Sequence, residues 1–317
     1  MNNIEDAFND KKIKKAVRKA KLKLTLKIVI ISTLVFIVGS YLNFKIFIKY
    51  SEKAFEENEA NVQLSVPNGY ISESNDICGF LGGSGNYKVA KDIGGKTIIL
   101  KDGISLFGLL TPMNYSRVQG GGYHVAGEWP VSLWEYGYKK MRFFHPDIKY
   151  KEYQNDIENI ENIPDGKIIE MGISFDKPYS IREMDIIQNE FKDVKVTWAW
   201  LDEFEDKKLE ELNKEVKEYD GKASGIYEFD IVGIGIHDKY IVDYDKEYDE
   251  LLNNLNKSNY DKYKNLYTEI MKRGKTTADK AKVLGVVVQG TKENLSKIKG
   301  NSRIKASSIG IVTDKLY

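Results

Sequence analysis

The chain has 317 residues, which is long enough for one or two domains with hydrophobic cores of their own. Its 48 basic and 47 acidic residues nearly cancel, so no overall positive field draws it onto nucleic acid, and we expect no nucleic-acid partner. The single cysteine, Cys78, excludes an internal disulfide, and we expect it to be a small buried side chain.

An uncharged, apolar run occupies residues 28–44, IVIISTLVFIVGSYLNF. As a helix it spans about 25 Å, slightly less than a hydrocarbon core of about 30 Å. Lys27 and Lys45 at its two ends can extend their charged heads outward, and Tyr41 and Phe44 suit the membrane interface. The run predicts a single transmembrane helix, with membrane lipid as a partner.

The charges on the two sides of this run predict its orientation. Residues 1–27 form a basic tail with nine Lys or Arg, whereas the opposite flank mixes Lys with Glu. By the positive-inside rule the tail is cytoplasmic, and the chain from about residue 46 lies outside the cell membrane. The long charged segment disfavours a signal peptide cleaved near Val38 and Ser40. A buried helix is disfavoured because the run is apolar on all sides.

The basic tail also carries a thin apolar stripe. Five residues are spaced i, i+3, i+4, i+7 and i+11, which places them on one face of a helix continuous with the membrane helix. They are Ile13, Ala16, Val17, Ala20 and Leu24. The stripe is suited to docking a partner protein. The alternative is that the basic run only binds anionic lipid headgroups, at about 1 kcal/mol per charge near the surface.

Beyond the membrane helix the composition changes three times. Residues 45–60 are a polar, acidic juxtamembrane stem, and residues 61–150 are rich in glycine, tyrosine and short β-type runs. Within the latter, NYKVAKDIGGKTIIL has a turn signal, Gly94-Gly95, between two alternating strands. Residues 151–166 are charged and end in Pro-Asp-Gly, which predicts a linker before a C-terminal domain of residues 167–317.

The C-terminal domain contains two β-α-β patterns. In the first, the strands KIIEMGISF and VKVTWAWL are joined by a helix that begins at a Ser180–Glu183 capping box and runs to Phe191. In the second, KVLGVVVQG and IKASSIGIVTD flank a short helix capped by Thr291. The predicted fold class is α+β: one transmembrane helix, a β-rich membrane-proximal domain, and an α+β sandwich with helices on one face of a mixed sheet.

Two of the four tryptophans, Trp198 and Trp200, are spaced i and i+2 in the strand VKVTWAWL. Strand alternation places them on one face with Val194 and Val196, which favours a place in the core over a ligand platform. We expect Trp200, which is nearest the acidic turn, to be the partly exposed ring.

No pattern in the chain indicates catalysis. The three histidines have no metal-ligand partner at a diagnostic spacing, and no serine-nucleophile motif occurs. The segment CGFLGGSGNYK resembles a phosphate-binding loop in composition alone, and a flexible turn is favoured. We therefore predict no enzymatic activity, no metal site and no cofactor.

Aromatic residues are the strongest candidates for an exterior binding surface, because their rings bring large contact area at low entropic cost. They cluster between residues 129 and 144, and the candidates are Trp129, Trp134 and Tyr136. Packing in the core of a β domain is the favoured alternative.

Several segments together carry a resemblance to a known family. They are the basic start that runs into one membrane helix, KKIKKAVRKAKLKLTLKIVIIS, then NVQLSVPNGY, MGISFDKPYS, VKVTWAWLD, and the ending VLGVVVQGTKENLSKIK with IKASSIGIV. From about residue 11 onward the chain resembles the sigma-factor regulator family, the single-pass anti-sigma proteins of Gram-positive bacteria with N- and C-terminal regulator domains.

The resemblance implies a membrane-bound regulator that holds an extracytoplasmic-function sigma factor inactive and releases it when the envelope is disturbed. It implies no catalytic residues. The short tail lacks the His-x-x-x-Cys-x-x-Cys zinc motif of the better-known anti-sigma fold, so it offers a helix and not a folded domain, and a helper membrane protein is a further expected partner. The alternative function is a membrane-anchored envelope binding module that contacts cell-wall polymer or a surface protein through its aromatic region.

Overall fold

The computed structural model describes residues 10–109, 123–126, 131–204, 206–222, 225–236 and 242–316. These residues form two compact units. The helix unit contains residues 10–52, 76–84 and 106–109, and the sheet unit contains residues 53–75, 85–105 and the described residues from 123 onward.

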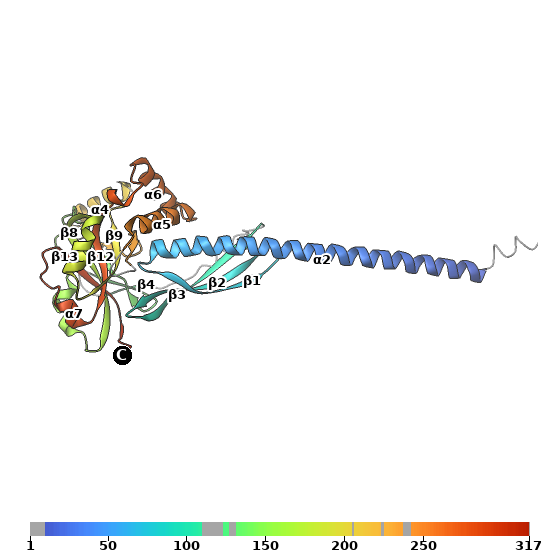
Figure 1. The fold of residues 1–317 in the computed structure, drawn as a ribbon, viewed down its shortest axis with the longest axis horizontal. Helices are drawn as coiled ribbons and strands as arrows, with labels where there is room; N and C mark the ends of the chain where they lie inside the picture. The colour runs from blue at the N-terminus through green and yellow to red at the C-terminus, as the bar shows by residue number, and fades with distance from the viewer. Residues whose placement is uncertain are drawn as a thin grey trace, which may run out of the picture. The chain divides into compact units, whose positions relative to one another are not determined.

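Helix α2, Asp10–Ser65, is continuous over 56 residues and contributes to both units (Figure 1). At 1.5 Å per residue it is about 84 Å long. The polar stem expected at residues 45–60 is therefore helical, and its charges form pairs one turn apart, such as Lys53 with Glu57 at 3.6 Å. The last turns of α2, from Lys53 onward, belong to the sheet unit.

The three strands after α2 form a sheet in chain order: β1 (Tyr70–Cys78), β2 (Gly82–Ile93) and β3 (Lys96–Gly108). Gly94 and Gly95 between β2 and β3 have φ values of +59° and +82°, as a two-residue hairpin turn requires, so the predicted turn is confirmed. The expectation that Cys78 is buried is wrong. It ends β1 in the turn of a hairpin and is exposed.

Two small sheets follow. β4 (Tyr123–Ala126), β5 (Ser132–Glu135) and β6 (Tyr138–Lys139) form one antiparallel sheet, and β7 (Arg142–Phe143) pairs with β10 (Ile226–Tyr227) to form the other. A short 3-10 helix, Asp156–Asn162, leads into the C-terminal part.

The main sheet has five strands: β8 (Lys167–Ser180), β9 (Lys195–Leu201), β11 (Gly233–Gly235), β12 (Lys282–Gly290) and β13 (Ile304–Asp314). Their order is β11-β9-β12-β8-β13, and every neighbouring pair is antiparallel. β12 lies between β8 and β9, and β8 lies between β12 and β13, so the two β-α-β units are split and interleaved as in ferredoxin-like folds. The expectation of a mixed sheet is wrong. The two parallel strands of each β-α-β unit are separated by one strand that is antiparallel to both, so no two parallel strands are neighbours in this sheet.

Five further helices accompany this sheet: α3 (Met184–Glu190), α4 (Asp206–Glu218), α5 (Tyr244–Lys257), α6 (Asp261–Lys272) and α7 (Lys292–Ser296). Short 3-10 helices, Ile181–Glu183 and Ala278–Lys280, precede α3 and β12. The predicted capping box is confirmed, since the backbone N–H of Ser180 donates to Glu183 Oε2 at 2.8 Å. The predicted Thr291 cap of α7 is also present.

Alternate residues of the strands point into two different cores. One core combines apolar residues of β8 with residues of α3, α5, α6 and α7, and it includes Leu64 of α2. The other lies against α4 and the aromatic segment 141–150. Because neighbouring residues of β12 alternate between the two cores, the cores lie on opposite faces of the sheet, and helices cover both faces instead of the expected one.

The tryptophans of β9 confirm one prediction and overturn two. Trp198 and Trp200 are 3% and 0% exposed, so both are core residues, and Trp200 does not reach the surface. Val196 packs in the core that contains α5, whereas both tryptophans pack in the core that contains α4. The pairing of β9 with β12 shifts register at Thr197, which is one extra residue in β9. Residues before and after Thr197 therefore point to opposite faces from those that regular alternation predicts, so Val194 and Val196 do not share a face with the tryptophans.

Candidate functional site

The apolar stripe of the basic tail lies on α2 in the helix unit. Ile13, Val17 and Leu24 are 43%, 49% and 60% exposed, and Ala16 and Ala20 are also exposed. The helical face that the sequence predicted is therefore open along its length. Its role in binding a partner stays a prediction.

Helix α2 is the one helix in the described part of the chain that is long and apolar enough to cross a membrane. None of its most apolar 18-residue stretch is buried within the protein. A helix that is apolar on all sides and uncovered by other elements has the composition of a membrane anchor.

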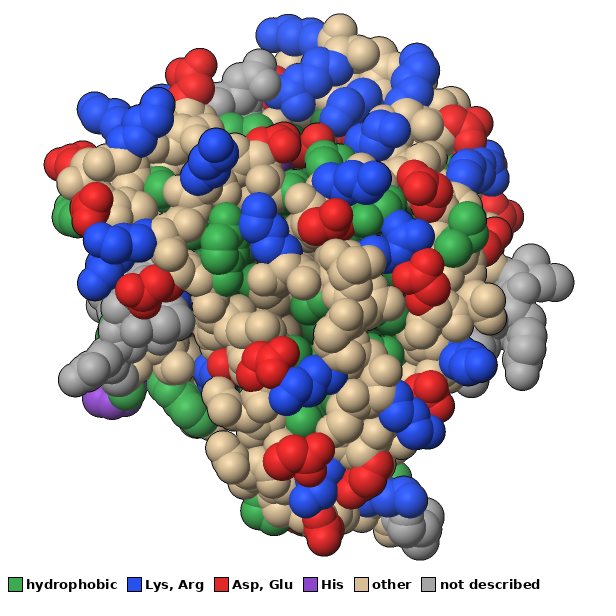
Figure 2. Space-filling view, turned by 90° about the vertical axis from the view of Figure 1, so that its left-hand side faces the viewer, with side chains coloured by type: hydrophobic (Ala, Val, Ile, Leu, Met, Phe, Trp, Pro, Cys, Tyr) green, Lys and Arg blue, Asp and Glu red, His purple; other side chains and the backbone are tan. Residues whose placement is uncertain are grey.

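The exterior aromatic residues divide into exposed and buried groups. Trp134 on β5 is 39% exposed and Tyr136 in the following turn is 44% exposed, whereas Phe143 and Phe144 are fully buried. Trp129 lies outside the described residues. On the face drawn in Figure 2, acidic and basic side chains are interspersed and the hydrophobic ones form small separate patches.

Sequence patterns did not indicate the contact by which the end of α2 joins α5. Asn61 Nδ2 donates to Asn259 Oδ1 at 2.9 Å, and Ser258 Oγ donates to Asn61 Oδ1 at 2.5 Å. One turn earlier on α5, Asn254 Nδ2 donates to Gln63 Oε1 at 2.6 Å. We call this group of five polar residues the joint. Asn61 and Ser258 are buried, and a buried amide needs partners of this kind, so the joint holds α2 in one register against α5.

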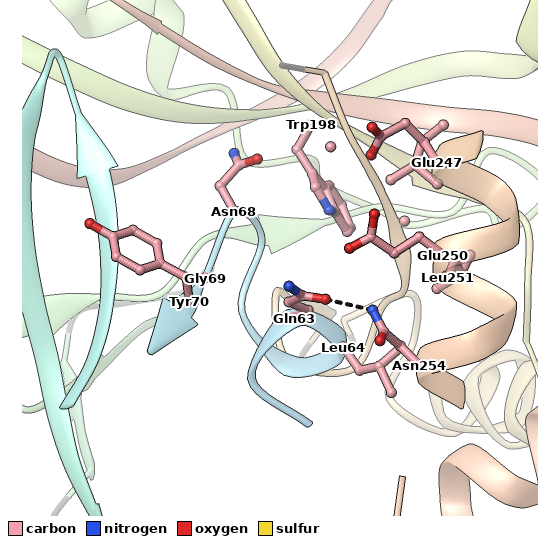
Figure 3. A pocket seen from close by; sticks show the side chains of 13 residues that line it. Gln63, Leu64, Asn68, Gly69, Tyr70, Trp198, Glu247, Glu250, Leu251 and Asn254 are labelled. Atoms are coloured by element: carbon pink, nitrogen blue, oxygen red, sulfur yellow. Dashed lines mark hydrogen bonds between the residues drawn. The ribbon is translucent and has the colours of Figure 1, made fainter. Parts of the chain in front are cut away.

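A cavity of about 170 Å³ opens beside the joint (Figure 3). Gln63, Leu64 and Asn68 line it from the α2 side, and Trp198 lines it from β9. In Figure 3, Glu247 and Glu250 project from α5 toward Trp198. The lining of the cavity therefore includes two carboxylates from α5 and an aromatic ring from β9. Among the described residues, no group of three or more His, Cys, Asp or Glu side chains is placed to hold a metal ion.

Glu59, two residues before Asn61 on α2, has a perturbed carboxyl group. It accepts a hydrogen bond from the backbone N–H of Ile71 at 2.9 Å. Burial raises the pKa of Glu59 above its ordinary value of 4.5, and the negative charge of Glu250 raises it further, against the lowering effect of the hydrogen bonds from Ile71 and Gln63.

This direction predicts a pH dependence of stability. A carboxyl group whose pKa is raised by folding contributes stability below its ordinary pKa and loses that contribution as the pH rises through the folded value. We therefore expect Glu59→Gln to melt at a higher temperature than the parent chain at pH 7, and the two melting temperatures to converge below pH 4.5. Thermal melts from pH 4 to 8, with Glu52→Gln on the same helix as the control, measure this difference. A constant difference across the range would contradict it.

A second group missed at the sequence level is a buried charge cluster of Lys91, Lys140, Glu170 and Glu228. Lys91 Nζ lies 2.9 Å from Glu170 Oε1 and 4.0 Å from Glu228 Oε2, and Lys140 Nζ lies 3.3 Å from Glu228 Oε1. The side chains of Lys91 and Glu170 are 1% and 0% exposed. Burial alone lowers the pKa of Lys91, but its two carboxylate neighbours reverse this and raise it. The sequence did contain a sign that Lys91 is buried, because strand alternation places it on the same inward face of β2 as Val89 and Ile93.

Both groups lie within the sheet unit and connect its early and late segments. The joint ties residues 61–63 to residues 254–259, and Lys91 of β2 pairs with Glu170 of β8. An apolar, uncovered α2 whose last turns belong to an α+β unit is the arrangement of a membrane-anchored protein.

Comparison with protein families makes this class specific. Residues 14–98 match the model of the sigma factor regulator N-terminal domain, and residues 160–311 match that of the sigma factor regulator C-terminal domain. The chain belongs to the sigma-factor regulator family, a regulatory and non-enzymatic family, and the resemblance read from its sequence is confirmed. Searches of the curated proteins and of the solved structures found no match.

Proposed function

We propose that the chain is a single-pass membrane anti-sigma factor of an extracytoplasmic-function sigma factor, which its exterior part releases when the envelope is disturbed. The observation that carries the proposal is the pair of family matches, one of which includes the apolar part of α2. The nine basic residues before the apolar run of residues 28–44 support a cytoplasmic N-terminus and an exterior sheet unit.

The stripe on α2 is the proposed sigma-factor contact. An amphipathic helix binds a groove through apolar anchors at i, i+3, i+4 and i+7, which is the spacing of the stripe. The surrounding lysines orient the tail at an anionic lipid surface. The charged side chains of the helix therefore bind lipid, and its apolar stripe binds the protein partner. A helper membrane protein is the proposed source of additional affinity, because the stripe alone is narrow.

Two variants on opposite faces of α2 test this contact. Leu24 lies in the stripe, whereas Leu22 lies half a helical turn away and is equally exposed, at 62% against 60%. Leu24→Asp should reduce the sigma factor that co-purifies with the full chain about tenfold or more, since a buried interface anchor contributes roughly 2 kcal/mol. Transcription from the sigma-dependent promoter should rise accordingly.

The matched control is Leu22→Asp, which should leave co-purification and transcription unchanged. Equal loss in both variants would point to a general effect of charge on the tail. Equal retention in both would contradict the proposed contact.

The exposed rings of Trp134 and Tyr136 favour one alternative, an envelope binding module that contacts cell-wall polymer or a surface protein. On that hypothesis, Trp134→Ala abolishes retention of the chain on purified cell wall while sigma-dependent transcription stays at its original level. The anti-sigma proposal predicts the opposite result for Leu24→Asp: sigma-dependent transcription rises while retention on the cell wall stays unchanged.

A further inference from the structure

The end of the β1–β2 hairpin and the end of β3 form an exposed apolar surface in the helix unit. We call residues 77–81 with residues 106–109 the hairpin tip. Phe80 is 80% exposed, Ile77 63%, Leu109 53% and Leu106 42%. The segments ICGFL and LFGL contain no charged residue. Four large apolar side chains on one tip exceed the scattered exposure that a soluble surface normally has.

The hairpin tip is attached to α2 where the apolar run ends. Asn43 Nδ2 donates to the carbonyl oxygen of Gly79 at 2.9 Å, and the backbone N–H of Leu81 donates to Asn43 Oδ1 at 2.5 Å. The hydroxyl of Ser51 donates to the carboxylate of Asp76 two turns further along. The tip therefore lies beside residues 43–51 of α2.

Aromatic rings continue this contact from the helix onto β3. The ring centroids of Phe44 and Phe47 are 6.1 Å apart, and those of Phe47 and Phe107 are 5.8 Å apart. These rings extend the apolar surface from the helix onto β3, and the exposed Tyr41, one turn earlier on α2, is of an aromatic type enriched where a transmembrane helix leaves the hydrocarbon.

The depth of the tip follows from the length of the apolar run. A hydrocarbon core of about 30 Å takes roughly 20 helical residues, so a helix whose apolar run covers residues 28–44 reaches the boundary of the core near Asn43. Backbone polar groups are tolerated at this depth only when they are paired. Backbone groups of Gly79, Leu81 and Leu109 in the tip are paired in this way: Gly79 N–H donates to Gly82 O, and Leu109 N–H donates to Leu81 O, both at 2.8 Å.

Leu81 in the tip has an unusual backbone conformation. Its φ is +54°, in the left-handed region that glycine or asparagine adopts more easily than leucine. Backbone strain of this kind persists at functional sites, and the pairing of Leu81 with Asn43 and Leu109 maintains it.

We propose that the hairpin tip is a membrane foot that inserts Phe80 and Ile77 into the lipid interface beside α2. The ligand is the bilayer leaflet at the Asn43 end of the helix. The inference rests on the proposed crossing of the membrane by α2 and does not depend on sigma-factor binding. With α2 crossing the membrane and the foot in the leaflet at the Asn43 end, the hairpin is held at a fixed depth.

The chain's single cysteine lies in the tip and provides the probe. The full chain, labelled at Cys78 with an environment-sensitive fluorophore, is reconstituted in phosphatidylcholine–phosphatidylglycerol vesicles. We expect the emission to shift to the blue and to be quenched more strongly by a nitroxide near the headgroup than by one at mid-chain. Two reference chains place the same fluorophore elsewhere in a Cys78→Ser background: Val35→Cys in the apolar run and Ser302→Cys on the exposed surface of the sheet unit.

The outcomes separate the foot from the anchor. If the probe at residue 35 is quenched while the probe at residue 78 resembles that at residue 302, the foot is absent although α2 crosses the membrane. If the probe at residue 35 is also in water, the crossing fails and the foot fails with it. Phe80→Ser should reduce quenching at Cys78 without changing the far-UV circular dichroism spectrum. Undiminished quenching in this variant would overturn insertion through the apolar tip.

Discussion

Replacing Lys91 with methionine should lower the free energy of unfolding by about 3–5 kcal/mol, which is the usual cost of removing one partner from a buried ion pair. The Lys91 and Glu170 side chains are 1% and 0% exposed, so no solvent can replace the lost ammonium. Glu170 would keep the carboxylate of Glu228 as a neighbour without the lysine between them. Urea denaturation of the full chain in detergent, followed by far-UV circular dichroism, measures the loss.

Lys88 on the same strand is the matched control. It also forms an ion pair, with Glu73, but the two side chains are 45% and 58% exposed. Lys88→Met should leave the unfolding midpoint nearly unchanged, because exposed ion pairs contribute little. Adding Glu170→Gln to Lys91→Met should recover part of the lost stability, since it removes the unpaired charge. Equal effects of Lys88→Met and Lys91→Met would contradict the importance of burial.

The second large effect is expected at Trp200. Trp200→Ala should cost about 3–5 kcal/mol of unfolding free energy, as for other large-to-small changes in a core. Its ring is fully buried and contacts Phe143 and Phe204, with centroid distances of 5.3 and 6.0 Å. The loss of these edge-to-face contacts adds to the cavity left behind. The same urea denaturation measures it.

Trp134 is the control for Trp200. It is 39% exposed, so Trp134→Ala should change the unfolding midpoint much less than Trp200→Ala. The pair also separates the two roles that the sequence left open for aromatic residues. A stability loss at Trp134 as large as that at Trp200 would assign Trp134 to the core and weaken the binding-module alternative.

Short-range patterns explain which parts of the fold were predictable. The Gly94-Gly95 turn and the Ser180–Glu183 capping box are defined by residues close in sequence, and both are present as predicted. The helical stripe from Ile13 to Leu24 depends only on helix periodicity, so its placement on one exposed face was also accessible. Its binding partner is not decided by periodicity.

Longer-range relationships explain the errors. The order of the five strands depends on which strand each crossover connection passes. A β-α-β pattern has the same sequence signature whether its two strands are neighbours in the sheet or have a third strand between them. The faces of β9 were misassigned because a one-residue register shift at Thr197 depends on pairing with β12. The joint was missed because asparagine and glutamine carry no periodic signal.

By itself the sequence determined the apolar helix, the charge asymmetry around it, the α+β class and the family, because each depends on composition or on spacing within one segment. Only the tertiary structure decided that Lys91 meets Glu170, that Asn61 meets Ser258 and Asn259, and that Asn43 holds the hairpin tip. These contacts join residues far apart in the chain. Their energies depend on burial and pairing, which arise only after the segments pack.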